Sequence, residues 1–439
     1  MPSNPFTYGK PIQNPARFFG RQEAVRKIFN ALKADQNVSL VGERRIGKTS
    51  LLQYISNPGV RAQNELSPQK SYFIFVDFQE KAKGYTAADF WREILNSLST
   101  QVHAPEISAR LEQALAKPDP DSAGLAQVLD EFSSRGQSLV LLLDEIENAA
   151  QQLEFGADFF GGLRSLASHR AMTLLISSCC ELNEKFAPTF FNIFSVLHLG
   201  PFSRPEAEAL VYGSLPDGNA GATFDPREVE AALAWSGLHP FFLQMACACL
   251  WDAHERGSLA LPERLGFARE QFFEQSDAHF RYYWDQSSEP ERQVLQQISA
   301  AKPPFGGLSL KQLQKRLEKP KAVAQKLAWR SLVVADDGAY RPFSPLFGEW
   351  ITENIRAGTV DASLDGKRTS LQEFFKERML AITDNILANL VWIAVLSFVA
   401  FGMGLLSHTS SLVFIGIGLI VLVLGFCAVS WLWKQNKRR

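Results

Sequence analysis

One short stretch of the sequence, Ser39–Gln53, has the residue types and spacing of a loop that binds phosphate. It reads SLVGERRIGKTSLLQ, in which two glycines are separated by four residues and followed at once by Lys48 and Thr49. Such glycines let the backbone wrap until its N–H groups point at phosphate oxygens, while the lysine reaches the β- and γ-phosphates and the threonine hydroxyl ligates Mg²⁺. We therefore expect a nucleotide site that uses the whole loop: Gly42, Glu43, Arg44, Arg45, Ile46, Gly47, Lys48, Thr49 and Ser50.

A second apolar run ends in two carboxylates. The run SLVLLLDE spans Ser138–Glu145, and Asp144 and Glu145 follow its five apolar residues directly. On a strand beside the loop, Asp144 would hold Mg²⁺ through water, and Glu145 would polarise the water that attacks the terminal phosphate. An exposed strand end that is merely acidic is the weaker alternative. The predicted catalytic residues are Lys48, Asp144 and Glu145, with Thr49 and Asp144 at the metal.

Four further residues are candidates for sensing the terminal phosphate. Ser177 and Ser178 end the apolar run TLLISS, where a side chain could meet that phosphate, although two small residues at a strand end are an equal alternative. Arg164 and Arg170 precede the run, and either could stabilise charge in the transition state. For this pair, solvated or ion-paired surface arginines are the favoured interpretation.

The elements that position these residues follow from apolar runs in the first half of the chain. Strands are predicted at 38–41, 71–78, 138–145 and 172–179, with one more ending near Leu199. The runs lack alternation and are separated by amphipathic stretches, which is typical of a parallel sheet covered by helices on both faces. The prediction is a three-layer α/β P-loop domain at 19–200, after an extended N-terminal segment at 1–18 that contains four prolines.

The pattern changes twice after residue 200. Residues 201–285 have helical periodicity and predict an all-helical lid domain. Residues 286–356 predict a helix, a helix–turn–helix and a short hairpin with its turn at Asp336-Asp337-Gly338, which is the order of a winged helix. Residues 357–385 are predicted to form a partly helical linker.

The composition gives no whole-chain argument for nucleic acid or an anionic surface as a partner. Lys and Arg total 45 against 46 Asp and Glu, so the formal net charge is −1. The five cysteines include no C-x-x-C pair and predict buried free thiols in a reducing compartment. The first residues, MPSNPFTYGK, do not form a signal peptide, so the bulk of the protein is expected in the cytosol.

The chain becomes far more apolar at 386–433. The segments ILANLVWIAVLSFVAFGMGLL and LVFIGIGLIVLVLGFCAVSWLW contain no charged residue, and each is long enough to cross a hydrocarbon core of about 30 Å. A hairpin buried in a soluble domain is the alternative, but neither segment has a polar face. The basic tail at 434–439, with Lys367 and Arg368 ahead of the first segment, predicts that both termini are cytosolic. We expect two transmembrane helices in the inner cell membrane, with the lipid bilayer as a partner.

Taken in order, the motifs resemble those of one class of proteins. RFFGRQEAV, LVGERRIGKTSLLQ, LLLDEIE, LISS, LGPFSRPEAEALV and SGLHPFFLQMACACL follow one another along the chain. The series is similar to the STAND class of signalling ATPases, which are close to AAA-type machines, and specifically to bacterial novel STAND ATPases, over roughly residues 15–350. Adenine rather than guanine is implied by this resemblance, and no guanine-reading N-K-x-D motif occurs in the sequence.

The resemblance implies roles for individual residues as well as ATP, ADP and Mg²⁺ as ligands. It places Phe19, Gly20 and Arg21 along the adenine side of the site. From the lid, Pro240 with Gly237 and His239 would close over the nucleotide. For His239, a polar residue in the turn before a helix that starts at Pro240 is an equal alternative.

The resemblance also implies how the protein works. Such proteins rest closed with ADP, exchange it for ATP on a trigger and form homo-oligomers, and slow ATP hydrolysis resets them. The winged helix would be a lever that docks back on the nucleotide, and the apolar hairpin would act on the membrane in bacterial defence or stress. Many members carry a long C-terminal repeat array as a sensor. This sequence leaves no room for one, so the trigger molecule is unknown.

The sequence admits two other interpretations. Segment 309–330 contains seven Lys and Arg against one Glu, so a DNA-binding winged helix would make the chain a membrane-tethered regulator. A solvated helix face or contact with lipid headgroups would account for the same charges. An ATP-driven transporter is disfavoured, because neither apolar segment carries an ionisable side chain to line a path.

Overall fold

The structure is a computed structural model that describes residues 4–150, 155–179, 188–215, 224–257, 259–301, 307–336 and 338–356. Contacts within the chain divide it into one unit of residues 1–356 and a second of 357–439. The predicted linker, apolar hairpin and basic tail at 357–439 lie outside the described residues. Among the helices that are described, none is both long and apolar enough to cross a membrane.

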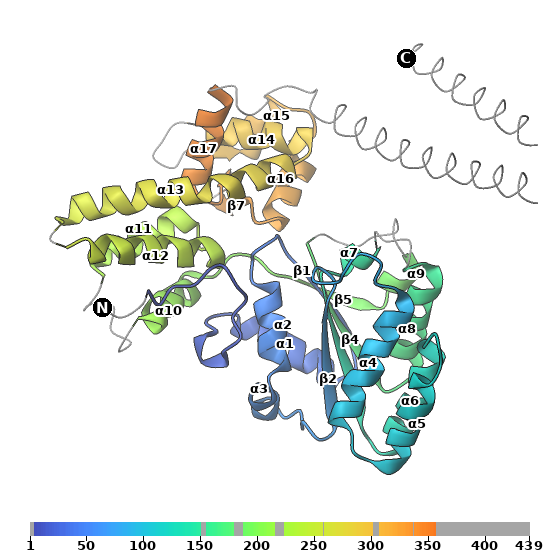
Figure 1. The fold of residues 1–439 in the computed structure, drawn as a ribbon. Coiled ribbons are helices and arrows are strands. Elements are labelled where there is room, and N and C mark those ends of the chain that lie inside the picture. Colours follow the sequence, from blue (N-terminus) through green and yellow to red (C-terminus); the bar gives the residue numbers. More distant parts are fainter. Residues whose placement is uncertain are drawn as a thin grey trace, which may run out of the picture. The chain divides into compact units, whose positions relative to one another are not determined.

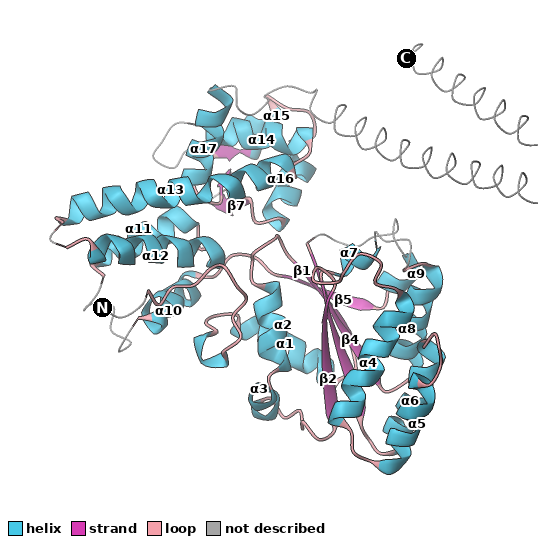
Figure 2. Cartoon of the chain, viewed as in Figure 1, coloured by secondary structure: helices cyan, strands magenta, loops and turns pink. Residues whose placement is uncertain are grey.

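A five-stranded parallel sheet forms the centre of the first part of the chain (Figure 2). Its strands are β1 (Asn37–Val41), β2 (Ser71–Asp77), β3 (Ser138–Asp144), β4 (Met172–Ser178) and β5 (Phe194–His198). They lie in the order β2-β3-β4-β1-β5, and each pairs in parallel with its neighbours. Because the carboxyl ends of all strands meet at one edge, the segments that follow β1, β3 and β4 are brought together there.

Helices cover both faces of this sheet (Figure 1). The helices are η1 (Pro15–Arg17), α1 (Gln22–Lys33), α2 (Lys48–Ser56), α3 (Pro58–Gln63), α4 (Ala87–Gln101), α5 (Pro105–Leu115), α6 (Ser122–Ser134), α7 (Ile146–Ala150), α8 (Ala157–His169) and α9 (Pro188–Phe191). Leu139, Leu141 and Leu143 of β3 pack in a core with α4, α5, α6 and α8. The intervening Val140 and Leu142 pack with α1, α2 and α3. Since successive strand residues point to opposite faces, an entirely apolar strand requires this double cover, and the predicted three-layer P-loop fold is confirmed.

Four helices follow the sheet. They are α10 (Arg204–Ser214), α11 (Pro226–Ser236), α12 (Pro240–Glu255) and α13 (Leu261–Asp285). The fully buried carboxylate of Glu228 on α11 accepts a hydrogen bond from Arg264 on α13 at 2.9 Å and lies 3.0 Å from Nε2 of His254 on α12. A buried carboxylate is costly unless it is paired, so these contacts hold three of the helices together.

The last described part combines helices with a small antiparallel sheet. In chain order it contains α14 (Glu289–Ser299), β6 (Leu308–Ser309), α15 (Leu310–Gln314), α16 (Pro320–Trp329), β7 (Val333–Asp336), β8 (Ala339–Pro342) and α17 (Pro345–Arg356). The strands pair in the order β6-β8-β7. Phe347 and Trp350 on α17 pack against Phe280 on α13, with ring centroids 5.2 and 6.3 Å apart. The expected helices and hairpin are present, whereas β6 and the helix α17 after the hairpin were not expected.

Candidate nucleotide-binding site

The predicted phosphate-binding loop joins the carboxyl end of β1 to the amino end of α2. Gly47 caps α2 with a φ of +99°, a conformation that favours glycine. A Cβ on Gly42 would lie 2.7 Å from the carbonyl oxygen of Leu199, so close packing also requires a glycine there. Lys48 is 4 % exposed and donates hydrogen bonds to the carbonyls of Gly42 at 2.9 Å and Glu43 at 3.4 Å. The ammonium therefore lies inside the loop, where a bound phosphate would meet it.

The fully buried carboxylate of Asp144 lies at the end of β3. The hydroxyl of Ser177, at the end of the neighbouring β4, donates a hydrogen bond to its Oδ1. Its Oδ2 has no hydrogen-bond partner among the residues that the structure describes. A buried carboxylate oxygen costs free energy unless a cation or a water meets it. Asp144 thus fits Mg²⁺, which binds oxygen ligands and keeps several waters. Thr49, the other predicted ligand, lines the cavity beside the loop.

Glu145 directly follows the last residue of β3. It has a left-handed φ of +54°, and non-glycine residues held in this region cluster at functional sites. Its backbone N–H donates to the Ser177 hydroxyl at 3.4 Å, so a single serine contacts both predicted catalytic acids. Burial raises the pKa of Glu145, although the Lys48 ammonium opposes this effect. The raised pKa makes the carboxylate a better proton acceptor.

Asp77, which was not among the predicted site residues, ends β2 in register with Asp144. Burial raises the pKa of Asp77, and the neighbouring charge of Asp144 adds to the rise. Its Oδ1 accepts a hydrogen bond from the backbone N–H of Gln79 at 2.8 Å. A signal for it existed in the sequence, because Asp77 follows an apolar strand just as Asp144 does.

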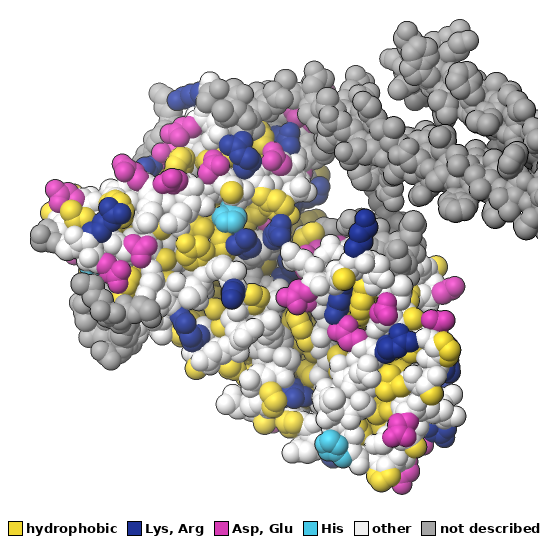
Figure 3. Space-filling model, viewed as in Figure 1, with side chains coloured by type: hydrophobic (Ala, Val, Ile, Leu, Met, Phe, Trp, Pro, Cys, Tyr) yellow, Lys and Arg dark blue, Asp and Glu magenta, His cyan; other side chains and the backbone are white. Residues whose placement is uncertain are grey.

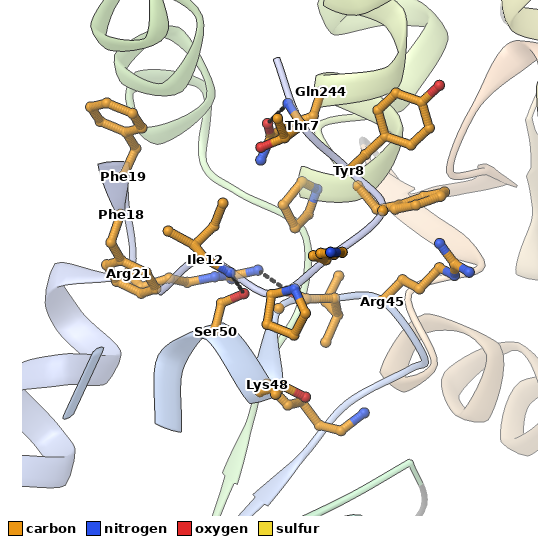
Figure 4. A pocket seen from close by; sticks show the side chains of 18 of the residues that line it. Thr7, Tyr8, Ile12, Phe18, Phe19, Arg21, Arg45, Lys48, Ser50 and Gln244 are labelled. Carbon is orange, nitrogen blue, oxygen red and sulfur yellow. Dashed lines mark hydrogen bonds between the residues drawn. The ribbon is translucent and has the colours of Figure 1, made fainter. Parts of the chain in front are cut away.

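A cavity of about 290 Å³ lies beside the loop (Figure 4). The loop residues Arg44–Ser50 line one side of it, and Glu145 and Gln79, which follow β3 and β2, line it as well. The N-terminal segment Thr7–Ile12, for which the sequence predicted no role, lines another side. Apolar side chains complete the lining, among them Phe19, Phe202, Leu210 and Pro240. The cavity thus joins a cationic loop to an apolar wall, the combination that a nucleotide requires.

Two of the three residues predicted along the adenine side line this cavity. Phe19 and Arg21 do so, whereas Gly20 packs against the ring of Phe202, which a Cβ would meet at 2.9 Å. Nη2 of Arg21 donates to the carbonyl of Ile46 at 3.0 Å, and its guanidinium lies 4.5 Å from the centroid of the Phe202 ring. Burial lowers the pKa of Arg21 to about 10, so it remains charged at neutral pH. Arg21 therefore stabilises the loop through its hydrogen bond to the Ile46 carbonyl.

The turn Gly237–Pro240 presents proline rather than histidine to the cavity. Pro240 lines it, while His239 is 1 % exposed and places Nε2 3.5 Å from the Tyr283 hydroxyl. Burial lowers the pKa of His239 to about 3, so its ring is neutral at physiological pH. This environment favours a packed turn residue over a nucleotide contact for His239. Gly237 has a φ of +56° and lies against the backbone of Phe343.

The arginines between the two loop glycines face the helical part of the chain. The guanidinium of Arg44 lies 5.3 Å from the centroid of the Tyr282 ring, and that of Arg45 lies 4.4 Å from the centroid of the Phe241 ring. The Tyr283 hydroxyl donates to the Arg44 carbonyl at 3.1 Å. Both α12 and α13 therefore contact the loop directly.

Glu43 connects the loop to the last described part of the chain. It is 5 % exposed, and its Oε2 accepts a hydrogen bond from Nε of Arg330 at 2.9 Å, across 287 residues of sequence. The same guanidinium lies 3.3 Å from Oε1 of Glu291. The sequence placed Arg330 in a basic run, but the structure turns it inward between two buried carboxylates.

Neither of the predicted sensor arginines lies at the cavity. Arg170 precedes β4, which places it at the amino edge of the sheet opposite the loop, where it pairs with Asp130. Arg164 is partly buried on α8 and does not line the cavity. Ser177 and Ser178 are both fully buried at the carboxyl edge. Of the four sensor candidates, only the serines share an edge with the loop.

Comparison with known proteins agrees with this arrangement. A family model described as Novel STAND NTPase 2 matches residues 26–304. The Walker-type ATPase PABY2304 of Pyrococcus abyssi superposes with a TM-score of 0.51 at 16 % identity, covering 78 % of this chain and 99 % of that chain. The ORC2 protein of Aeropyrum pernix, in its ADPNP–ADP complexes, gives 0.48 at 16 % identity, covering 78 % and 97 %. No curated protein matches. At 16 % identity the likeness to the Pyrococcus abyssi ATPase shows the fold alone.

Proposed function

Because the chain belongs to the novel STAND NTPase family, we propose that it is an ATP-dependent signalling switch whose assembly state follows the bound nucleotide. Lys48 and the backbone of the loop bind the phosphates, and Thr49 and Asp144 would hold Mg²⁺, which would neutralise phosphate charge. Glu145 accepts a proton from the water whose oxygen attacks the γ-phosphorus, and the bond to the β-phosphate oxygen breaks. Hydrolysis in this proposal is slow and returns the switch to its resting form.

The observation that supports a switch most directly is the contact of Arg330 with Glu43. Glu43 lies within the loop that would wrap the phosphates. A change in the shape of the loop would therefore move Glu43 and alter its hydrogen bond with Arg330. Glu291, on α14, holds the same guanidinium at 3.3 Å. We infer that residues 286–356 act as a winged-helix lever, docked on the loop in the resting form and released with ATP. Truncating one partner leaves a buried charge unpaired, so this contact is sensitive to single changes.

The proposal predicts that nucleotide controls the mass of the full-length chain in detergent. The non-hydrolysable ATP analogue should convert wild-type protein to a large oligomer, and ADP should not. Lys48→Ala should stay small with either ligand, because it removes the cation that meets the phosphates. Arg330→Ala should form the oligomer at lower analogue concentration, because the resting contact is lost. Size-exclusion chromatography with light scattering measures these masses.

Arg316→Ala is the matched control for Arg330→Ala. Arg316 lies in the same part of the chain and is exposed, with a hydrogen bond to Gln297 at 3.0 Å. It should behave as the wild type does. Equal masses with ADP and with the analogue would exclude nucleotide-driven assembly, and a shift in both arginine variants would exclude a specific role for the Glu43 contact.

For the apolar segments we propose a membrane anchor, in which residues 386–433 form a two-span hairpin in the inner membrane with both termini cytosolic. Clustering of hairpins on oligomerisation would then be the output, as a defence or stress effector requires. The support is the uncharged sequence of both segments.

A membrane-tethered DNA-binding regulator is the second candidate. Lys311, Lys315, Lys319 and Lys321 are exposed around the start of α16, where a winged helix meets DNA. Lys326 and Arg330 instead contact Glu291, and on the face shown in Figure 3 acidic and basic side chains are interspersed. Retardation of duplex DNA that weakens steeply with salt, and is reduced in Lys315→Glu, would support this candidate.

A further inference from the structure

The segment Asn4–Ile12, which we call the strap, runs from the helical lid to the start of α2. At the lid end, Nδ2 of Asn4 donates to the carbonyl of Ala248 at 3.3 Å and to Oδ1 of Asp252 at 3.0 Å, both on α12. Phe6 is 4 % exposed and stacks on Phe224, with ring centroids 5.9 Å apart. The lid end of the strap is therefore part of the folded core.

The middle of the strap is held by neighbouring helices. The backbone N–H of Thr7 donates to Oε1 of Gln244 on α12 at 3.0 Å, as Figure 4 shows beside the cavity. The Tyr8 hydroxyl donates to Gln275 on α13 at 2.8 Å, and its ring packs edge-on against Phe241. These contacts hold the middle of the strap in one conformation against α12 and α13.

At its other end the strap is attached to α2. The backbone N–H of Ile12 donates to Oγ of Ser50 at 3.0 Å, two residues after Lys48 (Figure 4). The sequence predicted Ser50 to bind the nucleotide, and here its hydroxyl accepts from the strap. All residues from Thr7 to Ile12 line the cavity. The strap thus connects the lid to the phosphate-binding helix and lines the cavity along its way.

We propose that the strap forms one wall of the nucleotide site and slows nucleotide release. In this proposal, Asn4 and Ser50 are positioning residues that hold the two ends of the strap. This inference rests on the proposed nucleotide binding in this cavity. A nucleotide bound between the loop and the strap contacts both, so it leaves faster when the strap or the lid moves aside. The strap therefore sets the rate of nucleotide release, and it couples that rate to movement of α12.

Substitutions at the two ends of the strap can distinguish a positioning role for Ser50 from direct contact between Ser50 and the nucleotide. Asn4 does not line the cavity, so Asn4→Ala loosens the strap without removing a contact to the nucleotide. Ser50→Ala removes the hydroxyl at the other end. Asn4→Ala deletes the hydrogen bonds to the Ala248 carbonyl and the Asp252 carboxylate, and Ser50→Ala deletes the one from the Ile12 N–H. Each change should speed the release of a fluorescent ADP analogue by about 2- to 10-fold. The measurement is stopped-flow displacement on the full-length chain in detergent.

Ser56→Ala is the matched control, because the Ser56 hydroxyl lies on the same helix and, among the described residues, bonds to the local carbonyl of Gln53 at 2.8 Å. Its release rate should equal that of the wild type. Hydrogen exchange supplies a second readout: bound ADP should protect the backbone of residues 4–12, and less so in Asn4→Ala. These amides would not respond if the strap were a remote structural segment.

Faster release in both Asn4→Ala and Ser50→Ala supports the strap as a wall. Faster release in Ser50→Ala alone overturns it, because Ser50 would then act as a nucleotide ligand. Release at the wild-type rate in both variants also overturns it. If the wild type binds no fluorescent ADP, while remaining folded, the proposed function fails at the earlier step and the inference fails with it.

Discussion

Replacing Glu145 by glutamine should reduce steady-state ATP hydrolysis by about 10²- to 10⁴-fold while nucleotide affinity changes little. The amide keeps the size of the side chain but cannot accept a proton from water. Glu145 lines the cavity and lies close enough to Lys48 for the ammonium to oppose its raised pKa. Phosphate release measures hydrolysis, and binding of a fluorescent ATP analogue measures affinity.

Glu80→Gln is the control for this change. Glu80 is an exposed acid in the segment after β2 and does not line the cavity, so hydrolysis should continue at the wild-type rate. Hydrolysis at the wild-type rate in Glu145→Gln would show that another group activates water. Asp77 would then be the next acid to replace, because it lies in register with Asp144 at the same edge.

The pH dependence of hydrolysis should follow from the same carboxyl group. Burial raises the pKa of Glu145, so its proton acceptor form is lost at a higher pH than for an exposed glutamate. The rate should be full above the raised pKa and should fall as the pH drops through it. In Glu145→Gln this acidic limb should disappear from the residual rate, and its persistence would assign the limb to a different group.

Replacing Gly237 by alanine should lower the free energy of unfolding by about 3 kcal/mol. The left-handed φ of +56° costs an alanine about 1 kcal/mol. A Cβ would lie 1.9 Å from the carbonyl oxygen of Phe343 and 2.6 Å from its carbonyl carbon, so the backbone has to move, at a further cost of about 1–3 kcal/mol. Thermal unfolding followed by tryptophan fluorescence should show a midpoint lower by roughly 5–10 °C.

Gly136 supplies a control that isolates the clash from the backbone strain. It has a φ of +61°, and a Cβ there would meet nothing within 4 Å. Gly136→Ala should therefore show only the strain, with a shift in the unfolding midpoint of roughly 2–4 °C. Equal shifts in the two variants would mean that the Gly237 turn does not pack on Phe343 as described.

The sheet domain was predictable because its signals are local. Apolar runs, loop glycines and acids at strand ends are all visible within a few residues, and β1 through β4 lie within one residue of the predicted bounds. The short helix α3 was missed although Asn57 and Pro58 form a recognisable start, with the Asn57 side chain accepting from the Gly59 N–H at 2.9 Å. That helix has only six residues, too few for periodicity to show.

Long-range contacts could not be predicted in the same way. Arg330 is one cation in a basic run, and only folding reveals Glu43 as its partner. The strap residues Thr7–Ile12 have no periodicity, so their place in the cavity depends wholly on tertiary contacts. The transmembrane hairpin at 386–433 stays a prediction.

The contact between Asn4 and α12 has a consequence for the order in which the protein is made. Asn4 leaves the ribosome first, but its partners Ala248 and Asp252 lie more than 240 residues later. At about 5–20 residues per second, translation needs roughly 12–50 s to supply them. After β5 (Phe194–His198) is made and before α12 follows, the nascent P-loop domain has its phosphate-binding loop but lacks the lid residues that hold the strap. A nucleotide captured by the nascent chain would exchange freely until the lid emerges, and a tag fused ahead of Asn4 would be attached beside α12, at the lid end of the strap, in the finished protein.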